Sequence, residues 1–335
     1  MLSRRARISF AIVYAAGLLL FSGLCAEWIV RQNGWRPWQH EDPGVTVVPG
    51  GQLFTSDPVL GYRHLPGQFS VRLPDGYTFG VTHLPNSLRI TRPLASYAVA
   101  ENRKPELWIF GCSFTHGWSL NDEETFPWLL QERLPEREIV NFGVSGYGTV
   151  QSLLQFRAAL VASTPEIAVL AYADFHDVRN TFLRTRRKEA APWNRLGPLI
   201  QPYARLTPAG ELQFDLAKVV YTEVPLMDRS ALINFLETTY NDLEERYHDS
   251  HAVSEALVVD MARIAREHGV RFIVAGISRA PATSRMLDFA RAQGIDAIDI
   301  AVDPSDVSYT NLPHDPHPNA RANRHYADRL ETVLR

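Results

Sequence analysis

Cysteine is scarce in this chain, and no charge of one sign dominates it. Two cysteines occur among 335 residues, Cys25 and Cys112, which excludes a framework of several disulfides. The formal net charge is −3, with acidic and basic residues mixed along the chain, so nothing indicates binding to nucleic acid. Hydrophobic residues make up 45% of the sequence, and we expect one main domain with additions rather than two equal domains.

A long apolar run lies at the N-terminus. It extends from Ile8 to Ala26, about nineteen residues, which is close to the length that crosses a bilayer as a helix. Three basic residues precede it: Arg4, Arg5 and Arg7. This positive flank is expected to stay in the cytoplasm. We therefore expect residues 1–26 to form a single-pass transmembrane anchor, with the rest of the chain on the extracytoplasmic (periplasmic) side of the membrane.

Two other interpretations of this segment are open. A signal peptide cleaved after Ala26 would place Leu24 at the −3 position, where a small residue is required. A lipoprotein signal would place the lipid on Cys25, but the bulky Leu24 directly precedes that cysteine. The uncleaved anchor is the interpretation that we favour.

Residues 27–104 are rich in proline, glycine and aromatic residues. Alternating runs at Phe69–Leu73 and Tyr77–Val81 predict two strands, and Pro74–Gly76 between them predicts a tight turn. We expect a β-rich region that packs on the main domain as a spacer. A direct role in ligand binding is the alternative.

From residue 105 to 335 strand and helix signals alternate, which predicts an α/β domain of three layers with a parallel sheet covered on both faces. The expected strands are Leu107–Phe110, Ile139–Phe142, Ile167–Tyr172, Val270–Ala275 and Ala297–Ile300. The expected helices are Thr125–Arg133, Val150–Val161, Val253–Glu267, Ala282–Ala292 and Ala320–Leu334. The stretch at about 181–250 interrupts this alternation, and its hairpin signal (Ala204–Phe214) and helical signal (Ala231–Tyr247) predict a lid-like insertion.

Residues capable of nucleophilic chemistry lie at two places where this domain is expected to form loops. Gly111-Cys112-Ser113 follows the first strand, so Ser113 is expected at the edge where open α/β sheets hold their ligands. Asp315 and His317 lie on a proline-punctuated loop before the final helix. A serine becomes a nucleophile when an adjacent base takes its proton, and a histidine oriented by a carboxylate is such a base.

These blocks resemble those of the SGNH (GDSL-type) hydrolases, over roughly residues 105–180 and 250–335. The family's Gly-Asp-Ser is Gly111-Cys112-Ser113 here, its later glycine corresponds to Gly146, and its Asp-x-x-His is shortened to Asp315-Pro316-His317. The family's Gly-x-Asn-Asp block is missing, because Ala173–Asn180 has no asparagine at the expected place. The resemblance implies a flavodoxin-like sheet and a serine-dependent ester hydrolase that needs no cofactor and no metal.

The resemblance also implies a role for each matching residue. Ser113 would be the nucleophile, His317 the base and Asp315 the group that orients the base. Asparagine supplies one oxyanion donor in the family, and here a different side chain must replace it. The expected oxyanion hole consists of the backbone N–H groups of Ser113 and Gly146 and a third donor from either His176 or Asn180.

The expected substrate is an ester, in particular an O-acyl group on an envelope carbohydrate. Three alternatives are open: an O-acyltransferase acting on a cell-surface polysaccharide, an inactive SGNH domain that binds glycans, and a metallohydrolase. Groups with metal-ligand chemistry for the last are His176, Asp177, His314, Asp315 and His317.

Overall fold

The computed structural model describes residues 4–39, 44–98, 104–197 and 200–335. The chain forms two compact units, a larger one of residues 42–220 with 248–335 and a smaller one of residues 1–41 with 221–247. The larger unit contains a parallel sheet, and the smaller unit contains the apolar N-terminal helix.

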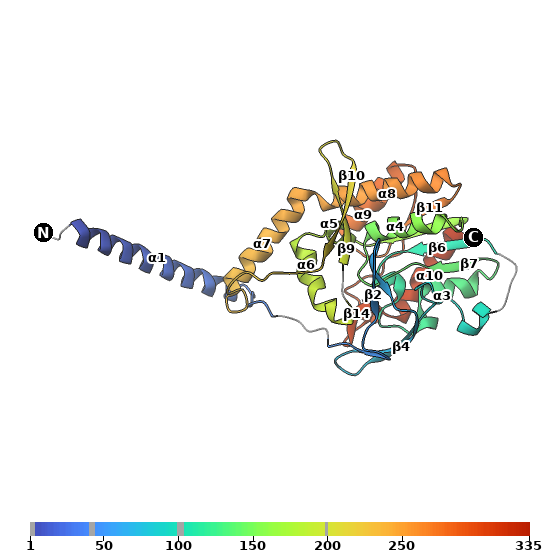
Figure 1. Ribbon diagram of the computed structural model, residues 1–335, viewed down its shortest axis with the longest axis horizontal. Coiled ribbons are helices and arrows are strands. Elements are labelled where there is room, and N and C mark those ends of the chain that lie inside the picture. The colour runs from blue at the N-terminus through green and yellow to red at the C-terminus, as the bar shows by residue number, and fades with distance from the viewer. Residues whose placement is uncertain (1–3, 40–43, 99–103, 198–199) are drawn as a thin grey trace. The chain divides into compact units, whose positions relative to one another are not determined.

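A five-stranded sheet forms the centre of the larger unit (Figure 1). Its strands are β6 (Glu106–Phe110), β7 (Glu138–Asn141), β8 (Ile167–Tyr172), β11 (Arg271–Gly276) and β12 (Asp296–Asp299). They lie in the order β7-β6-β8-β11-β12, and every neighbouring pair is parallel. This is the flavodoxin-like strand order, so the expected sheet is confirmed.

Helices cover both faces of this sheet. One face carries α3 (Phe126–Arg133) and α10 (Ala320–Leu334), and the other carries α4 (Thr149–Leu160), α8 (Ser250–Glu267) and α9 (Pro281–Ala292). On α10, Tyr326, Leu330 and Leu334 recur every four residues and are buried against the sheet. The three-layer α/β/α architecture expected from the alternating signals is confirmed.

The described residues between 44 and 98 form small antiparallel sheets and one short 3-10 helix, η1 (Leu94–Ala98). The strands β1 (Thr46–Val48), β4 (Gly67–Arg72) and β5 (Thr78–His83) form one sheet, and β2 (Phe54–Asp57) pairs with β3 (Gly61–His64). The expected β4–β5 hairpin is present, and Gly76 in its turn has φ = +93°, which glycine adopts without strain. Apolar residues of this region share one core with Trp118, Val144 and Phe182.

Between β8 and α8 the chain leaves the sheet. It forms α5 (His176–Thr181), α6 (Arg184–Ala190), the 3-10 helix η3 (Ala191–Leu196) and the antiparallel hairpin of β9 (Ile200–Leu206) and β10 (Leu212–Lys218). The hairpin was expected here. The remaining short elements of this unit are α2 (Ser113–His116), η2 (Asp122–Glu124), η4 (Val307–Tyr309), β13 (Thr310–Asn311) and β14 (Asp315–Pro318).

The smaller unit contains α1 (Arg4–Gln32), a helix of 29 residues that is long and apolar enough to cross a membrane. Its last turns contact the start of α7 (Ala231–His248), the helix expected in this region. The Glu27 carboxylate accepts hydrogen bonds from the Ala231 and Leu232 N–H groups at 3.0 and 2.8 Å. The first amides of a helix have no partner within the helix, so Glu27 satisfies two of them.

Candidate active site

Ser113 lies three residues beyond Phe110, the last residue of β6, and begins the single-turn helix α2. The strand order reverses at β6, because β7 lies on one side of it and β8 on the other. Ligands bind at such switch points of open α/β sheets. Ser113 is therefore at the sheet edge that the sequence predicted, and its residue is 5% exposed.

Asp315 and His317 lie on the short strand β14, directly before α10. The expectation of an irregular loop is wrong in this detail, and residues two apart on a strand point to the same side. The His317 Nδ1 atom is 2.5 Å from Asp315 Oδ1, and its Nε2 atom is 3.0 Å from Ser113 Oγ. The three residues of the expected triad thus form one hydrogen-bonded chain.

Several donors surround the Asp315 carboxylate. The His317 N–H lies 2.7 Å from it, the Trp118 indole N–H 3.2 Å and the Ser119 hydroxyl 3.4 Å. Burial by itself raises the pKa of Asp315, but the hydrogen bonds and charge of His317 outweigh burial and hold that pKa below its usual value. An ionised Asp315 holds the imidazole proton on Nδ1 and leaves Nε2 to accept the Ser113 proton.

A cavity of about 270 Å³ lies beside Ser113 and His317. Gly146 borders it with φ = +87°, and a Cβ atom there would come within 2.4 Å of the Tyr62 hydroxyl. Within the described residues, neither the Ser113 N–H nor the Gly146 N–H has an intramolecular acceptor. Both amides can therefore donate to a ligand, as an oxyanion hole requires. A larger hollow of about 590 Å³, bordered by Trp108 and Phe142, includes none of the triad.

The two side chains expected as a third oxyanion donor do not border the cavity beside Ser113. His176 and Asn180 are both fully buried on α5. The Asn180 amide accepts from the Val150 N–H at 3.0 Å and donates to Ser254 Oγ at 2.9 Å, so it joins α5 to α4 and α8. His176 lies 3.4 Å from Thr149 Oγ1, and burial and nearby arginines lower its pKa well below the usual value.

Sequence reasoning missed most of the cavity wall. Trp193 and Arg186 come from the insertion, Arg179 from α5, and Phe54 and Tyr62 from the N-terminal strands. The Gly-Tyr-Arg run around Tyr62 and the basic run around Arg186 are visible in the sequence, but neither indicates which part of the domain it approaches.

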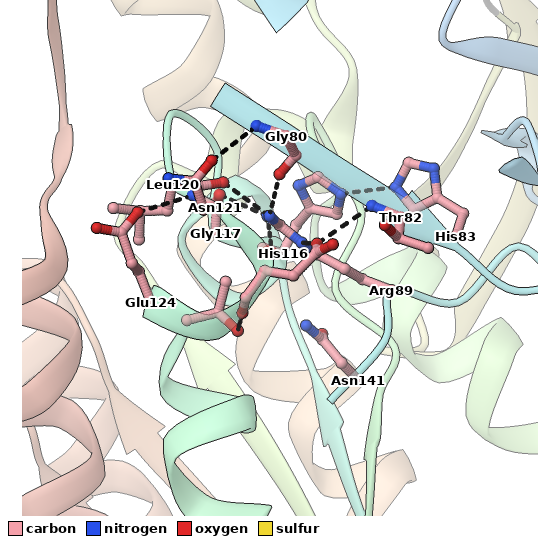
Figure 2. Close-up of polar contacts among 12 residues, drawn as sticks. Gly80, Thr82, His83, Arg89, His116, Gly117, Leu120, Asn121, Glu124 and Asn141 are labelled. Atoms are coloured by element: carbon pink, nitrogen blue, oxygen red, sulfur yellow. Dashed lines mark hydrogen bonds and ion pairs between the residues drawn. The ribbon is translucent and has the colours of Figure 1, made fainter. Parts of the chain in front are cut away.

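Arg89 connects the N-terminal region to the segment that follows the nucleophile (Figure 2). Its residue is 1% exposed, and its guanidinium donates to the carbonyls of His116, Gly117 and Leu120 at 2.6–2.8 Å. Its Nε atom is 2.8 Å from the Asp122 carboxylate. Arg89 therefore binds protein groups, whereas Phe54 and Tyr62 of the same region border the cavity. The spacer and the ligand-binding interpretations of residues 27–104 both stay predictions.

Three buried histidines, His64, His83 and His116, form the group in the described part of the chain whose ring nitrogens lie near enough for a shared metal, within 4.8 Å. The geometry does not fit one. The His64 ring stacks on the other two at centroid distances of 4.3 and 4.2 Å, whereas a metal binds in the ring plane. His83 and His116 share a 2.9 Å hydrogen bond (Figure 2), and the buried Arg89 charge disfavours a cation beside them.

The groups of the metallohydrolase alternative are not brought together. Asp177 accepts hydrogen bonds from Tyr172 and Ser254 and pairs with His251. His314 is exposed and pairs with Asp75. His176 is buried on α5, and Asp315 and His317 belong to the hydrogen-bonded chain that ends at Ser113.

The buried histidines predict a loss of stability in acid. Burial lowers the pKa of His83 to about 3 and that of His64 well below its usual value, while the unfolded chain titrates near 6.5. Their contribution is thus complete above pH 6.5 and is lost as the pH falls, by about 1.4 kcal/mol per pH unit for each histidine. His64→Leu should reduce the slope of unfolding free energy against pH, measured in urea between pH 6 and 4, by about 1.4 kcal/mol per pH unit, which corresponds to about one proton. An unchanged slope would show that His64 is not held neutral in the folded protein.

No family model matches this chain, and no curated protein matches it. Solved structures that match are esterases, lipases and acylhydrolases, several of the G-D-S-L family. The TesA structure is 15% identical, with a TM-score of 0.42, over 69% of this chain and 98% of that one. A psychrotrophic esterase, EstA from Pseudoalteromonas sp., is 12% identical over 69% of this chain and 97% of that one, with a TM-score of 0.40. A two-domain esterase active on acetylated mannans is 12% identical over 69% of this chain and 49% of that one, with a TM-score of 0.37. These scores are low, so the function is argued from the site's own geometry.

Proposed function

We propose that this protein is a serine-dependent ester hydrolase of the SGNH type. The observation that carries the proposal is the hydrogen-bonded chain from Asp315 through His317 to Ser113, at the switch point of a flavodoxin-like sheet and beside a cavity. A serine that only caps a helix or lies on the surface does not require a histidine whose other ring nitrogen is held by a partly buried carboxylate. That arrangement is what activates a serine hydroxyl as a nucleophile.

In the proposed mechanism Ser113 Oγ attacks the ester carbonyl while His317 Nε2 takes its proton. Asp315 stabilises the imidazolium that forms. The backbone N–H groups of Ser113 and Gly146 donate to the developing oxyanion. His317 then protonates the departing alcohol, and a water molecule, deprotonated by the same nitrogen, releases the acid from the acyl-enzyme. Each oxyanion donor contributes roughly 3–4 kcal/mol to lowering the barrier.

We also propose where the enzyme acts and which ester it cleaves. Arg4, Arg5 and Arg7 on the short flank of α1 favour a cytoplasmic N-terminus, with the catalytic site outside the cytoplasm. An enzyme anchored there meets envelope polymers, and O-acyl groups on an envelope carbohydrate are the esters that we propose it removes. Transfer of the acyl group to a sugar hydroxyl would use the same acyl-enzyme.

The test is covalent labelling with a biotinylated fluorophosphonate that does not cross membranes. In intact spheroplasts of a bacterial expression host, the probe should label this protein at Ser113 alone, as read by peptide mass spectrometry. Ser113→Ala should abolish the label, and Ser284→Ala, which removes an exposed hydroxyl on α9, should keep it. Labelling only after lysis would overturn the proposed orientation, and no labelling in either case would overturn the proposed nucleophile.

A further inference from the structure

We infer that the cavity beside Ser113 binds an anionic group of the ester, a carboxylate or a phosphate, through Arg179 and Arg186. The inference rests on the proposed function and names its substrate class. Two arginines and one carboxylate, that of Glu189, are the charged side chains among the residues that border the cavity. The wall therefore carries an excess of one positive charge next to the nucleophile.

Arg186 is buried and is held mostly by neutral acceptors. Its residue is 7% exposed, and it donates to the Gly146 carbonyl at 2.8 Å and to Gln201 Oε1 at 3.3 Å. Its one carboxylate neighbour, Glu189, is 3.7 Å away with a side chain that is 53% exposed. An ion pair so long and so open to solvent offsets little of the cost of burying a guanidinium.

Arg179, like Arg186, donates to a neutral acceptor. It donates to the Tyr147 carbonyl at 3.0 Å and lies over the Phe175 ring, with its guanidinium carbon 4.3 Å from the ring centroid. Among the described residues, its buried Nε atom has no hydrogen-bond partner, and the buried Ser145 hydroxyl beside the cavity has none either. Buried donors normally have acceptors.

The two arginines also repel each other. Burial, and after it the charge of Arg179, lowers the pKa of Arg186 to about 10. An anion in the cavity that both arginines border would offset this repulsion and could accept hydrogen bonds from their guanidinium groups. Arginine presents its donors in a planar fork that matches the oxygens of a carboxylate or a phosphate.

The same contacts place the anion close to the reacting ester. Arg186 binds the carbonyl of Gly146, whose N–H is a proposed oxyanion donor, and Ser113 borders the same cavity. The charge must therefore belong to the ester itself. An acylated uronic acid or an acylated sugar phosphate has this chemistry, whereas an acylated neutral sugar does not.

The kinetic test compares three acetate esters that share one acyl group. They are para-acetoxybenzamide, which is neutral, para-acetoxybenzoate and para-acetoxyphenyl phosphate. For the full-length protein in detergent, we expect kcat/KM for at least one anionic ester to exceed that for the neutral one by roughly 10- to 100-fold, the range for one or two charge-assisted hydrogen bonds. The two anionic esters distinguish a carboxylate from a phosphate site.

Arg179→Met and Arg186→Met should each reduce this preference about tenfold or more, and Arg186→Lys, which keeps the charge, should retain part of it. Arg187→Met is the matched control, because Arg187 lies over the Phe182 ring and does not border the cavity, so the preference should stay. If Arg186→Met slows all three esters equally, Arg186 stabilises the oxyanion instead, and the inference is wrong.

A binding measurement separates this inference from the proposed function. By calorimetry, para-acetamidobenzoate or para-acetamidophenyl phosphate should bind the wild-type protein at least tenfold more tightly than para-acetamidobenzamide, and Arg179→Met should remove the difference. Anion-selective binding without ester turnover would support the subsite and overturn the hydrolase proposal. Turnover with equal rates and equal binding for all ligands would overturn the subsite alone.

Discussion

Asp315→Asn should lower kcat for p-nitrophenyl acetate by about 10⁴, with little change in KM. The Asp315 carboxylate is 2.5 Å from His317 Nδ1 and keeps the proton on that nitrogen. An amide can instead donate to Nδ1, which moves the proton to Nε2 and removes the acceptor for Ser113. An amide also leaves the imidazolium formed in the transition state without a counter-charge. The loss falls on the chemical step, so kcat reports it.

The chain offers a matched control in a second Asp–His pair. Asp75 lies 2.5 Å from His314 Nδ1, but both side chains are about 40% exposed and neither contacts Ser113. Asp75→Asn should leave kcat within about twofold of the wild type, as for a surface ion pair. Comparable losses in both variants would show that the assignment of the acid is wrong, as would full activity in Asp315→Asn.

Arg89→Met should lower the free energy of unfolding by about 3–5 kcal/mol, measured as a shift in urea midpoint. The methionine fills most of the space but leaves the Asp122 carboxylate, at 13% side-chain exposure, without its cation. It also leaves the carbonyls of His116 and Leu120 without the donor that Arg89 supplies. Buried acceptors that lose their donors cost the full penalty of their desolvation.

Arg63→Met provides the comparison for Arg89. Arg63 is an arginine of the same region, but its side chain is 46% exposed and its ion pair with Asp57 is 3.9 Å long. Its removal should cost less than about 1 kcal/mol. A similar shift for both variants would mean that the contacts shown in Figure 2 do not stabilise the larger unit more than a surface pair does.

The parts of the fold that the sequence predicted are those set by local pattern. Ile167–Tyr172 is an unbroken apolar run, and it forms β8 at those bounds with all six residues buried. The Ser113–His317 contact was predictable because parallel strands end at one edge, which brings residues some 200 positions apart together.

The rest of the site depends on packing that no local pattern reports. His176 follows β8 closely, and Asn180 lies four residues further on. Both are buried on α5, where Asn180 bonds to Ser254. Arg186 reaches the cavity from α6 of the insertion, and the hairpin and helical signals of that insertion do not indicate which part of the domain α6 approaches. Asp315 and His317 were assigned to an irregular loop because of their prolines, although a strand of four residues tolerates proline where no ladder N–H is required.

Glu27 changes what removing the apolar N-terminal helix would mean for the protein. The carboxylate is covalently part of the apolar N-terminal helix, yet it completes the first turn of a helix that begins some 200 residues later, with Ser230 supplying the acceptor for the Ile233 N–H. A truncated protein that starts after Gln32 would begin α7 with two bare amides, whereas one that starts at Glu27 would retain their acceptor. The N-terminal boundary that keeps the first turn of α7 capped therefore lies at or before Glu27.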